Sequence, residues 1–293
     1  MSHYQAGGFN MLPPIVKNLL IINGIMFLAT MVLQINFGIN LNQILGLHWI
    51  ASEDFEWYQV ITYMFMHGGF GHIFFNMFAV WMFGSAIENT WGSKRFLTYY
   101  IITGIGAAVL HYAIMYFTDL APIINLIDNF LHAPGPDTLK ALLSEHQFHI
   151  NPNFHHEINS LYEETKLDLN AVAQGSTADR HLENAYTFLS EYRQHFLNLP
   201  VVVGASGSLF GLLLAFGMMF PNTRLFFIFL PVPIKAKYFV MGYGALELFL
   251  GLQNSAGSNV AHFAHLGGML FGFILIMFWR KFAKDDDSFY KQF

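Results

Sequence analysis

Six stretches of this chain are nearly free of charged side chains, which limits it to folds that a lipid bilayer can hold. They cover residues 18–37, 67–87, 96–118, 197–222, 238–252 and 259–279, each with at most one Asp, Glu, Lys or Arg. About 20 helical residues cross the hydrocarbon core of a bilayer. Only 11% of the 293 residues are charged, whereas soluble domains carry roughly 25%. The sequence therefore predicts an all-α membrane protein with a bundle of six transmembrane helices, of which the fifth is short and contains Glu247.

Basic residues fall into alternate connections between these stretches. They precede the first stretch and follow the second, fourth and sixth: Lys17, Lys94, Arg95, Arg224, Lys235, Lys237, Arg280, Lys281 and Lys284. Cytoplasmic loops carry an excess of Lys and Arg. We therefore expect a multi-pass protein of the cytoplasmic (cell) membrane with both termini in the cytoplasm. The first stretch lacks a small-residue cleavage site after it, so we expect it to stay as a signal anchor.

The connection between the third and fourth stretches is the one large polar segment. Residues 118–196 carry a formal net charge of −7, compared with −5 for the whole chain. We expect an acidic, helical, extracytoplasmic insertion there. Residues 178–197 predict an amphipathic helix, because a stripe recurs at spacings of three and four: Leu182, Tyr186, Leu189, Arg193 or Tyr192, and Phe196. The expected organisation is a cytoplasmic N-terminal segment 1–16, spans one to three in 17–117, the insertion 118–196, spans four to six in 197–281 and a cytoplasmic tail 282–293.

A serine and a histidine lie at similar predicted depths in two of the spans. Ser206 is about six residues into the fourth span and His265 about six into the sixth, both counted from the outside. At 1.5 Å per residue, each lies roughly 9 Å below the outer edge. Polar side chains are costly in hydrocarbon and usually serve a function. A histidine that takes the hydroxyl proton would activate the serine as a nucleophile, so the pair predicts a membrane hydrolase.

A second group of polar side chains opens the second span. His67 precedes a Gly-Gly pair, and His72 and Asn76 stand four residues apart on one helix face. Acyl transfer needs hydrogen-bond donors aimed at the developing oxyanion, and His72, Asn76 and the Ser206 amide are candidates. The alternative is that His72 and Asn76 only satisfy each other between helices. No carboxylate is expected at a comparable depth to orient His265, so the sequence favours a dyad. Glu247 is expected to be a packing or hydrogen-bonding group, and a functional role for it is the less favoured alternative.

Small residues follow both candidate catalytic residues at helical spacing. Gly207 and Gly211 form one pair and Gly268 and Gly272 another, and Gly204 opens the serine motif. Such pairs let helices approach closely, so we expect these five glycines to pack the helices that carry Ser206 and His265. Packing alone, without catalysis, is the competing explanation of the serine motif.

Histidine-based metal binding is a weaker alternative. His262 and His265 stand three residues apart and could join His67 and His72 in a metal site, and the His149–His156 stretch could bind metal weakly. A zinc site would leave the Gly-Ala-Ser-Gly motif without a purpose. We therefore expect no metal, no cofactor and no nucleic-acid partner.

The three motifs together resemble the rhomboid intramembrane serine proteases. The resemblance covers about 67–279 without the insertion and follows the family's order. Its motifs are His67-x4-His72-x3-Asn76, Gly204-x-Ser206-Gly207 and Ala264-His265-x2-Gly268-x3-Gly272. It implies Ser206 as nucleophile, His265 as base, His72 and Asn76 as oxyanion donors and His67 as a hydrogen-bonding neighbour. It also implies a water-filled cavity open to the outside, and single-span membrane proteins in the bilayer as substrates, cut near the outer end of their transmembrane helix.

Two features depart from that pattern. Many members carry Trp-Arg four residues before a threonine in the first external loop, whereas Tyr58-Gln59 stand four before Thr62 here. The insertion 118–196 is longer than the loop of the simplest members and is a hypothetical lid or docking cap for substrates. The competing function is a catalytically inactive rhomboid-like protein that binds membrane clients, although such proteins usually lack the serine or the histidine.

Overall fold

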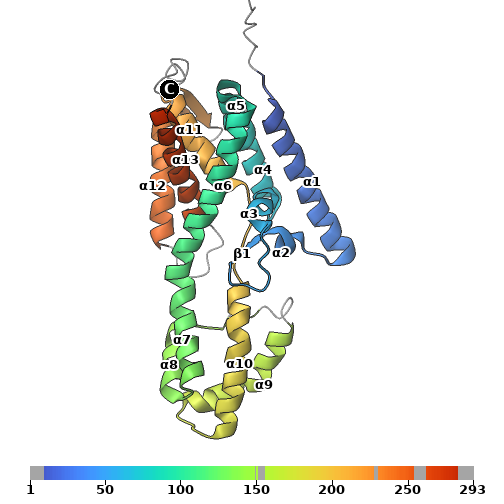
Figure 1. Ribbon diagram of the computed structural model, residues 1–293, viewed down its shortest axis with the longest axis vertical. Helices are drawn as coiled ribbons and strands as arrows, with labels where there is room; N and C mark the ends of the chain where they lie inside the picture. The colour runs from blue at the N-terminus through green and yellow to red at the C-terminus, as the bar shows by residue number, and fades with distance from the viewer. Residues whose placement is uncertain (1–9, 149, 151–155, 228–229, 254–261, 283–293) are drawn as a thin grey trace, which may run out of the picture. The chain divides into compact units, whose positions relative to one another are not determined.

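The computed structural model describes residues 10–148, 150, 156–227, 230–253 and 262–282 (Figure 1). Most of the predicted segment 1–16, the tail after residue 282, and His149 and His155 of the histidine-rich stretch lie outside the described residues. The chain divides into two compact units. One comprises residues Met1–Leu47, Glu56–Tyr112 and Val202–Phe293, and the other His48–Phe55 and Ala113–Val201.

A helix forms in each of the six predicted spans of the first unit. These are α1 (Pro14–Phe37), α4 (Phe70–Ala79) with its continuation α5 (Ser85–Trp91), α6 (Ser93–Met115), α11 (Ser206–Met219), α12 (Ala236–Gln253) and α13 (His262–Phe282). A π-helical turn, Val80–Gly84, joins α4 to α5. Among the residues that the structure describes, four helical segments are long and apolar enough to cross a membrane: Pro14–Phe37, Phe70–Trp91, Ser93–His132 and His262–Lys281. The apolar helix α11 has only 14 residues. The predicted all-α membrane fold is confirmed.

Short elements connect these helices. They are α2 (Leu41–Leu45), β1 (Leu47–His48), α3 (Gln59–Thr62), a 3₁₀ turn (Tyr63–Phe65), β2 (Val201–Val202), β3 (Arg224–Phe227) and β4 (Leu230–Lys235). Strand β1 pairs with β2, and β3 pairs antiparallel with β4. The fourth span was expected to begin at residue 197, but its helix begins only at Ser206 because Gly204 adopts a φ of 128°. This later start puts Ser206 in the first turn of α11.

Helix α11 lies at the centre of the first unit, packed against α12 and α13 (Figure 1). Two hydrogen bonds from side-chain hydroxyls to backbone carbonyls join α6 and α11. Tyr99 Oη of α6 donates to Gly211 O at 2.9 Å, and Ser208 Oγ of α11 donates to Tyr100 O at 2.8 Å. These bonds satisfy polar groups internally where a bilayer offers no water. They hold the serine-bearing helix in a fixed position against α6.

A buried carboxylate fixes the start of α1. Glu88 of α5 accepts from the backbone N–H of Ile15 at 3.0 Å and of Val16 at 2.9 Å. The first N–H groups of a helix lack partners within the helix, and a carboxylate there also interacts favourably with the helix dipole. Glu88 is thus a structural group that joins α5 to α1.

The second unit is a small helical assembly with its own apolar core. It contains a π-helical turn (Tyr116–Leu120), α7 (Ala121–His132), α8 (Pro136–Glu145), α9 (His156–Ala173) and α10 (Asp179–Asn198). Its fully buried side chains include Ile127, Phe130, Leu139, Leu142, Phe188 and Tyr192. The predicted helix 178–197 agrees with α10 within one residue at each end. Its predicted stripe was wrong at Tyr186, which is 45% exposed, because the buried face runs through Ala185, Phe188 and Tyr192.

The expected insertion therefore is helical, but its boundary with the third span is not a helix end. Helical backbone continues from Ser93 through His132, and the second compact unit begins at Ala113. A helix that continues without a break gives no sequence signal for a boundary between the predicted span and the predicted insertion.

Candidate active site

The backbone around Ser206 is arranged by Gly204. The Gly204 N–H donates to Tyr63 O at 2.9 Å, and its φ of 128° lies in a region that side chains other than glycine rarely adopt. A Cβ on Gly204 would lie 2.8 Å from Nε2 of His72. Gly204 thus lies before the helix and not within a helix-packing surface, and the reason for a glycine here is backbone conformation and the close approach of His72.

The His265 ring lies against the helix that carries Ser206. Its imidazole stacks on the Phe210 ring with centroids 4.1 Å apart and planes 7° apart. Phe210 is four residues after Ser206 in α11, so the two share one helix face. The imidazole therefore lies against α11 at Phe210, one helical turn after Ser206, and the His265 side chain is only 14% exposed.

A carboxylate contacts His265, contrary to expectation. Glu247 Oε2 of α12 lies 2.9 Å from Nδ1 of His265 and 2.7 Å from Nδ1 of His262. The expectation that no carboxylate stands at the depth of the histidine was wrong. Helices α12 and α13 are consecutive and packed together, so a residue near the end of α12 meets residues at the start of α13.

The polar residues of the second span form a group beside Gly204. Asn76 Nδ2 and His67 Nε2 are 3.1 Å apart, and the His67 and His72 rings meet edge to face at 5.0 Å. His67 and Asn76 are buried. The alternative prediction, in which His72 and Asn76 form a hydrogen bond with each other, does not match the structure, because the side-chain partner of Asn76 is His67. His72 instead faces Gly204, two residues before Ser206.

The four helical glycines make close contacts with two different helices. Gly268 of α13 lies directly on the backbone of Gly207, where an added Cβ would meet the Gly207 carbonyl carbon at 2.8 Å. Gly211 faces Thr103 of α6, and Gly272 faces Tyr99 and Thr103 of the same helix. Gly268 thus brings α13 onto the backbone of α11, whereas Gly207, Gly211 and Gly272 all admit residues of α6, Ala107 being the one closest to Gly207.

The connection between α1 and α4 is anchored without the Trp-Arg pair. Gln59 is buried, accepts from the Glu56 N–H at 3.1 Å and donates to Ile44 O at 3.2 Å. Thr62 Oγ1 donates to Leu45 O at 2.7 Å. The neutral side-chain amide of Gln59 therefore anchors this connection in the absence of the Trp-Arg pair.

Metal-ligand side chains also meet here, in a different combination from the one considered from sequence. Among the described residues, Glu247, His262 and His265 place one ligand atom each within 4.8 Å of one another. His67 and His72 are not in this group. The short contacts from both imidazole Nδ1 atoms to one carboxylate oxygen are those of N–H donors to an acceptor.

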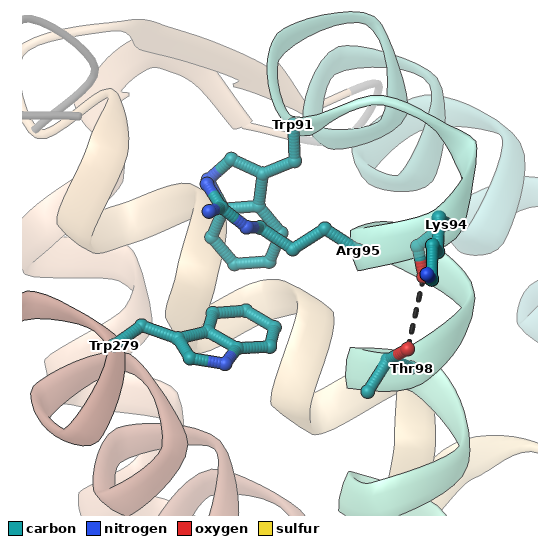
Figure 2. Close-up of a pocket in the computed structure, with 5 residues that line it drawn as sticks. All are labelled: Trp91, Lys94, Arg95, Thr98 and Trp279. Carbon is teal, nitrogen blue, oxygen red and sulfur yellow. Dashed lines mark hydrogen bonds between the residues drawn. The ribbon is translucent and has the colours of Figure 1, made fainter. Parts of the chain in front are cut away.

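A separate hollow lies at the other end of α6. Trp91, Lys94, Arg95, Thr98 and Trp279 line a cavity of about 440 Å³, in which the Arg95 guanidinium lies 5.4 Å from the centre of the Trp279 ring (Figure 2). Ala107, which contacts Gly207 beside Ser206, is nine residues further along α6 than Thr98. At 1.5 Å per residue that is roughly 14 Å along the helix, so this hollow is distinct from the candidate active site.

Sequence comparisons connect the chain to one family. The Rhomboid domain matches residues 54–122 and 181–282, more than half of the chain. Rhomboid protease GluP of Bacillus subtilis (strain 168) is 39% identical over 54 residues, which are 18% of this chain and 11% of GluP. Rhomboid-like protein 11, chloroplastic, of Arabidopsis thaliana is 26% identical over 95 residues, 32% of this chain and 34% of that protein.

The matched segments thus span no more than 34% of the length of either relative. The family match omits residues 123–180, the middle of the predicted insertion. It includes the helices that carry His72, Ser206, Glu247 and His265. With more than half of its length matched by the Rhomboid domain and helices apolar enough to cross a bilayer, this chain is an integral membrane protein that belongs to the rhomboid family.

Proposed function

We propose that this protein is an intramembrane serine endopeptidase in which Ser206 is the nucleophile and His265 the general base. The observation that carries the proposal is the stacking of the His265 ring on Phe210, one helical turn from Ser206. The Nδ1 contact to Glu247 leaves Nε2 as the nitrogen that can accept a proton. Family membership supports the reaction class, and the name of GluP attributes protease activity to that relative.

The proposed reaction is acyl transfer through a covalent intermediate. Ser206 Oγ attacks the carbonyl carbon of the scissile peptide bond while Nε2 of His265 takes the hydroxyl proton. The tetrahedral intermediate then expels the amine, which receives that proton from His265, and leaves an ester on Ser206. Water, deprotonated by the same imidazole, hydrolyses the ester and frees the serine.

The oxyanion would be stabilised by donors on α4 and at the start of α11. His72 faces the backbone of the serine motif at Gly204, Asn76 is held by His67, and the Ser206 N–H is at the N-terminus of its helix. Loss of one such donor typically costs on the order of 10²–10³ in rate. His67 serves as the hydrogen-bonding neighbour that orients Asn76.

The substrates we propose are single-span membrane proteins, cut near the outer end of their transmembrane helix. We also propose six spans in the cell membrane, with both termini cytoplasmic, as the basic connections indicate. The insertion 118–196 would then lie outside, as a lid or docking cap. Replacing 122–195 by a short Gly/Ser bridge should change which substrates are cut and leave hydrolysis intact, whereas unchanged cleavage of every substrate would refute the cap.

The decisive experiment uses purified protein in proteoliposomes with a single-span reporter and a fluorophosphonate probe. Wild-type protein should cut the reporter and become labelled, and Ser206→Ala should do neither while keeping the same thermal stability. A chelator should not inhibit either reaction. Cleavage by Ser206→Ala would remove the serine from its role, and absence of labelling in the wild type would favour an inactive client-binding protein.

The two histidines of α13 provide an internal control. His265→Ala should abolish cleavage because its ring is the one stacked on α11, whereas His262→Ala should retain activity. The opposite result would show that the base has been misassigned.

A further inference from the structure

We infer that Glu247 is a positioning residue that completes a Ser206–His265–Glu247 arrangement, an inference that rests on the proposed function. Glu247 Oε2 lies 2.9 Å from Nδ1 of His265. The carboxylate is on α12 and the imidazole on α13, so the contact joins two separate helices.

The depth of burial makes this contact informative. The Glu247 side chain is 6% exposed, and those of His262 and His265 are 12% and 14% exposed. Ionisable groups inside a membrane protein are costly and are kept where they pair and act. A glutamate placed only to pack helices would contribute as much with an apolar side chain, without the cost of burying its charge.

The carboxylate selects one tautomer of the base. A carboxylate oxygen accepts hydrogen bonds, so Nδ1 of His265 must carry its proton toward Glu247. The unprotonated Nε2 is then the nitrogen left to face Ser206. When the base takes the serine proton, the carboxylate stabilises the imidazolium that forms. Two independent contacts, with Glu247 at the ring edge and Phe210 on the ring face, fix the imidazole in position and in tautomer.

His262 strengthens the same arrangement from the first position of α13. Its Nδ1 lies 2.7 Å from the same Oε2 of Glu247. A second donor on one oxygen restricts the rotation of the carboxylate, so Glu247 is held while it holds His265. His262 therefore affects the reaction only through Glu247 and His265, and its loss should slow the enzyme by less than tenfold.

A purely structural role is the competing explanation. A carboxylate near the N-terminus of α13 interacts favourably with the helix dipole, and its loss would then lower stability and leave the chemical step alone. The rate of serine labelling by a fluorophosphonate separates the two, because it requires the activated hydroxyl and no bound protein substrate.

The test compares Glu247→Gln with Glu88→Gln in the full-length protein. Both residues are buried carboxylates of the first unit, but Glu88 holds the start of α1. Glu247→Gln should slow labelling and kcat about 10- to 100-fold with KM unchanged, the range of a weakened general base. Glu88→Gln should label at the wild-type rate. A folded Glu247→Gln protein with the wild-type labelling rate would overturn the inference.

Tautomer measurement decides the case in which Glu247→Gln does not fold. Nitrogen NMR of ¹⁵N-histidine wild-type protein, with the His265 signals identified as those missing from a His265→Ala sample, should find His265 protonated at Nδ1 and not at Nε2. Protonation at Nε2 instead would overturn the inference. Failure of the proposed function is distinguishable from both results, because wild-type protein would then not be labelled at all.

Discussion

The imidazole of His265 lies flat on the ring of Phe210, with the ring planes 7° apart. Phe210 is buried in α11 and His265 is in the first turn of α13. The contact therefore transmits the position of the serine-bearing helix directly to the proposed base. The aromatic face of Phe210 also excludes water from one side of the imidazole.

Removing the Phe210 ring that supports His265 should reduce the rate of the reaction more than the stability of the fold. In Phe210→Leu the flat support is lost while most apolar volume remains, so we expect kcat to fall about tenfold, because small displacements of catalytic groups reduce rate steeply. Phe216→Leu is the matched control, since Phe216 is also buried in α11 but packs on Phe83. The measurement is reporter cleavage beside thermal stability. Equal losses of activity in the two variants would argue against a specific role for Phe210.

The contact between Gly207 and Gly268 makes a second prediction. A Cβ at position 268 would overlap the Gly207 carbonyl, so Gly268→Ala must push α13 away from α11. We expect a loss of stability on the order of 3 kcal/mol, as for overpacked cores, and loss of cleavage. Gly242→Ala on α12 is the control, because no atom lies within 4 Å of its added Cβ. Thermal unfolding in detergent measures the stability of both variants, and reporter cleavage measures their activity. A stable, active Gly268→Ala protein would contradict the close packing.

Gly204 should tolerate no side chain either, for a different reason. Alanine at a φ of 128° is strained, by about 1–3 kcal/mol, and its Cβ would displace His72. We expect Gly204→Ala to lose most activity, whereas Gly68→Ala, with open space around its Cβ, should retain it. Labelling by a fluorophosphonate checks whether the serine itself has been disturbed. Wild-type labelling in Gly204→Ala would show that the backbone there is more adaptable than its φ indicates.

Much of this architecture could be read from the sequence, because apolar length and small-residue spacing are local properties. The six stretches each contain a helix, and Gly207 does meet Gly268. The role of Gly204 could not be read, since motif spacing does not reveal whether a glycine precedes a helix or lies within it. The apolar stripe of α10 was misplaced at Tyr186 because the α10 helix offers several apolar residues, and only its packing partners select Phe188.

The contact of Glu247 was missed for a geometric reason. The predicted depths of Ser206 and His265 follow from their positions in their own spans, whereas the partner of Glu247 depends on how α12 packs against α13. Glu247 is six residues before the end of α12, and His265 is three after the start of α13. Two consecutive antiparallel helices share an end, so residues at similar distances from that end come together. The distances of Glu247 and His265 from the shared end of α12 and α13 could have indicated this contact. A carboxylate embedded in an apolar helix is a reason to look for such a partner.

The second unit offers a prediction about pH, through Asp168 of α9. Its carboxylate accepts hydrogen bonds from Asn184 Nδ2 at 2.7 Å and His181 Nδ1 at 2.5 Å, both on α10. These bonds, that from Asn184 above all, hold the pKa of Asp168 below its usual range. Because the folded pKa is lower than the unfolded one, the ionised carboxylate stabilises the unit above the unfolded pKa of about 3.9. That stabilisation is lost as the pH falls through the folded pKa.

Asp168→Asn should therefore loosen the pairing of α9 with α10 at neutral pH. Amide hydrogen exchange in the full-length protein should be faster in both helices for Asp168→Asn than for wild type at pH 6–7. The difference should shrink as the pH falls below about 3.9 and should vanish once the wild-type carboxyl is protonated, below its lowered folded pKa. Glu164→Gln, an exposed carboxylate on the same helix, should exchange like wild type. Equal exchange of Asp168→Asn and wild type at every pH would mean that other contacts hold the two helices together. Fluorophosphonate labelling of Ser206, which needs no bound protein substrate, should be unaffected, because Asp168 belongs to the other compact unit.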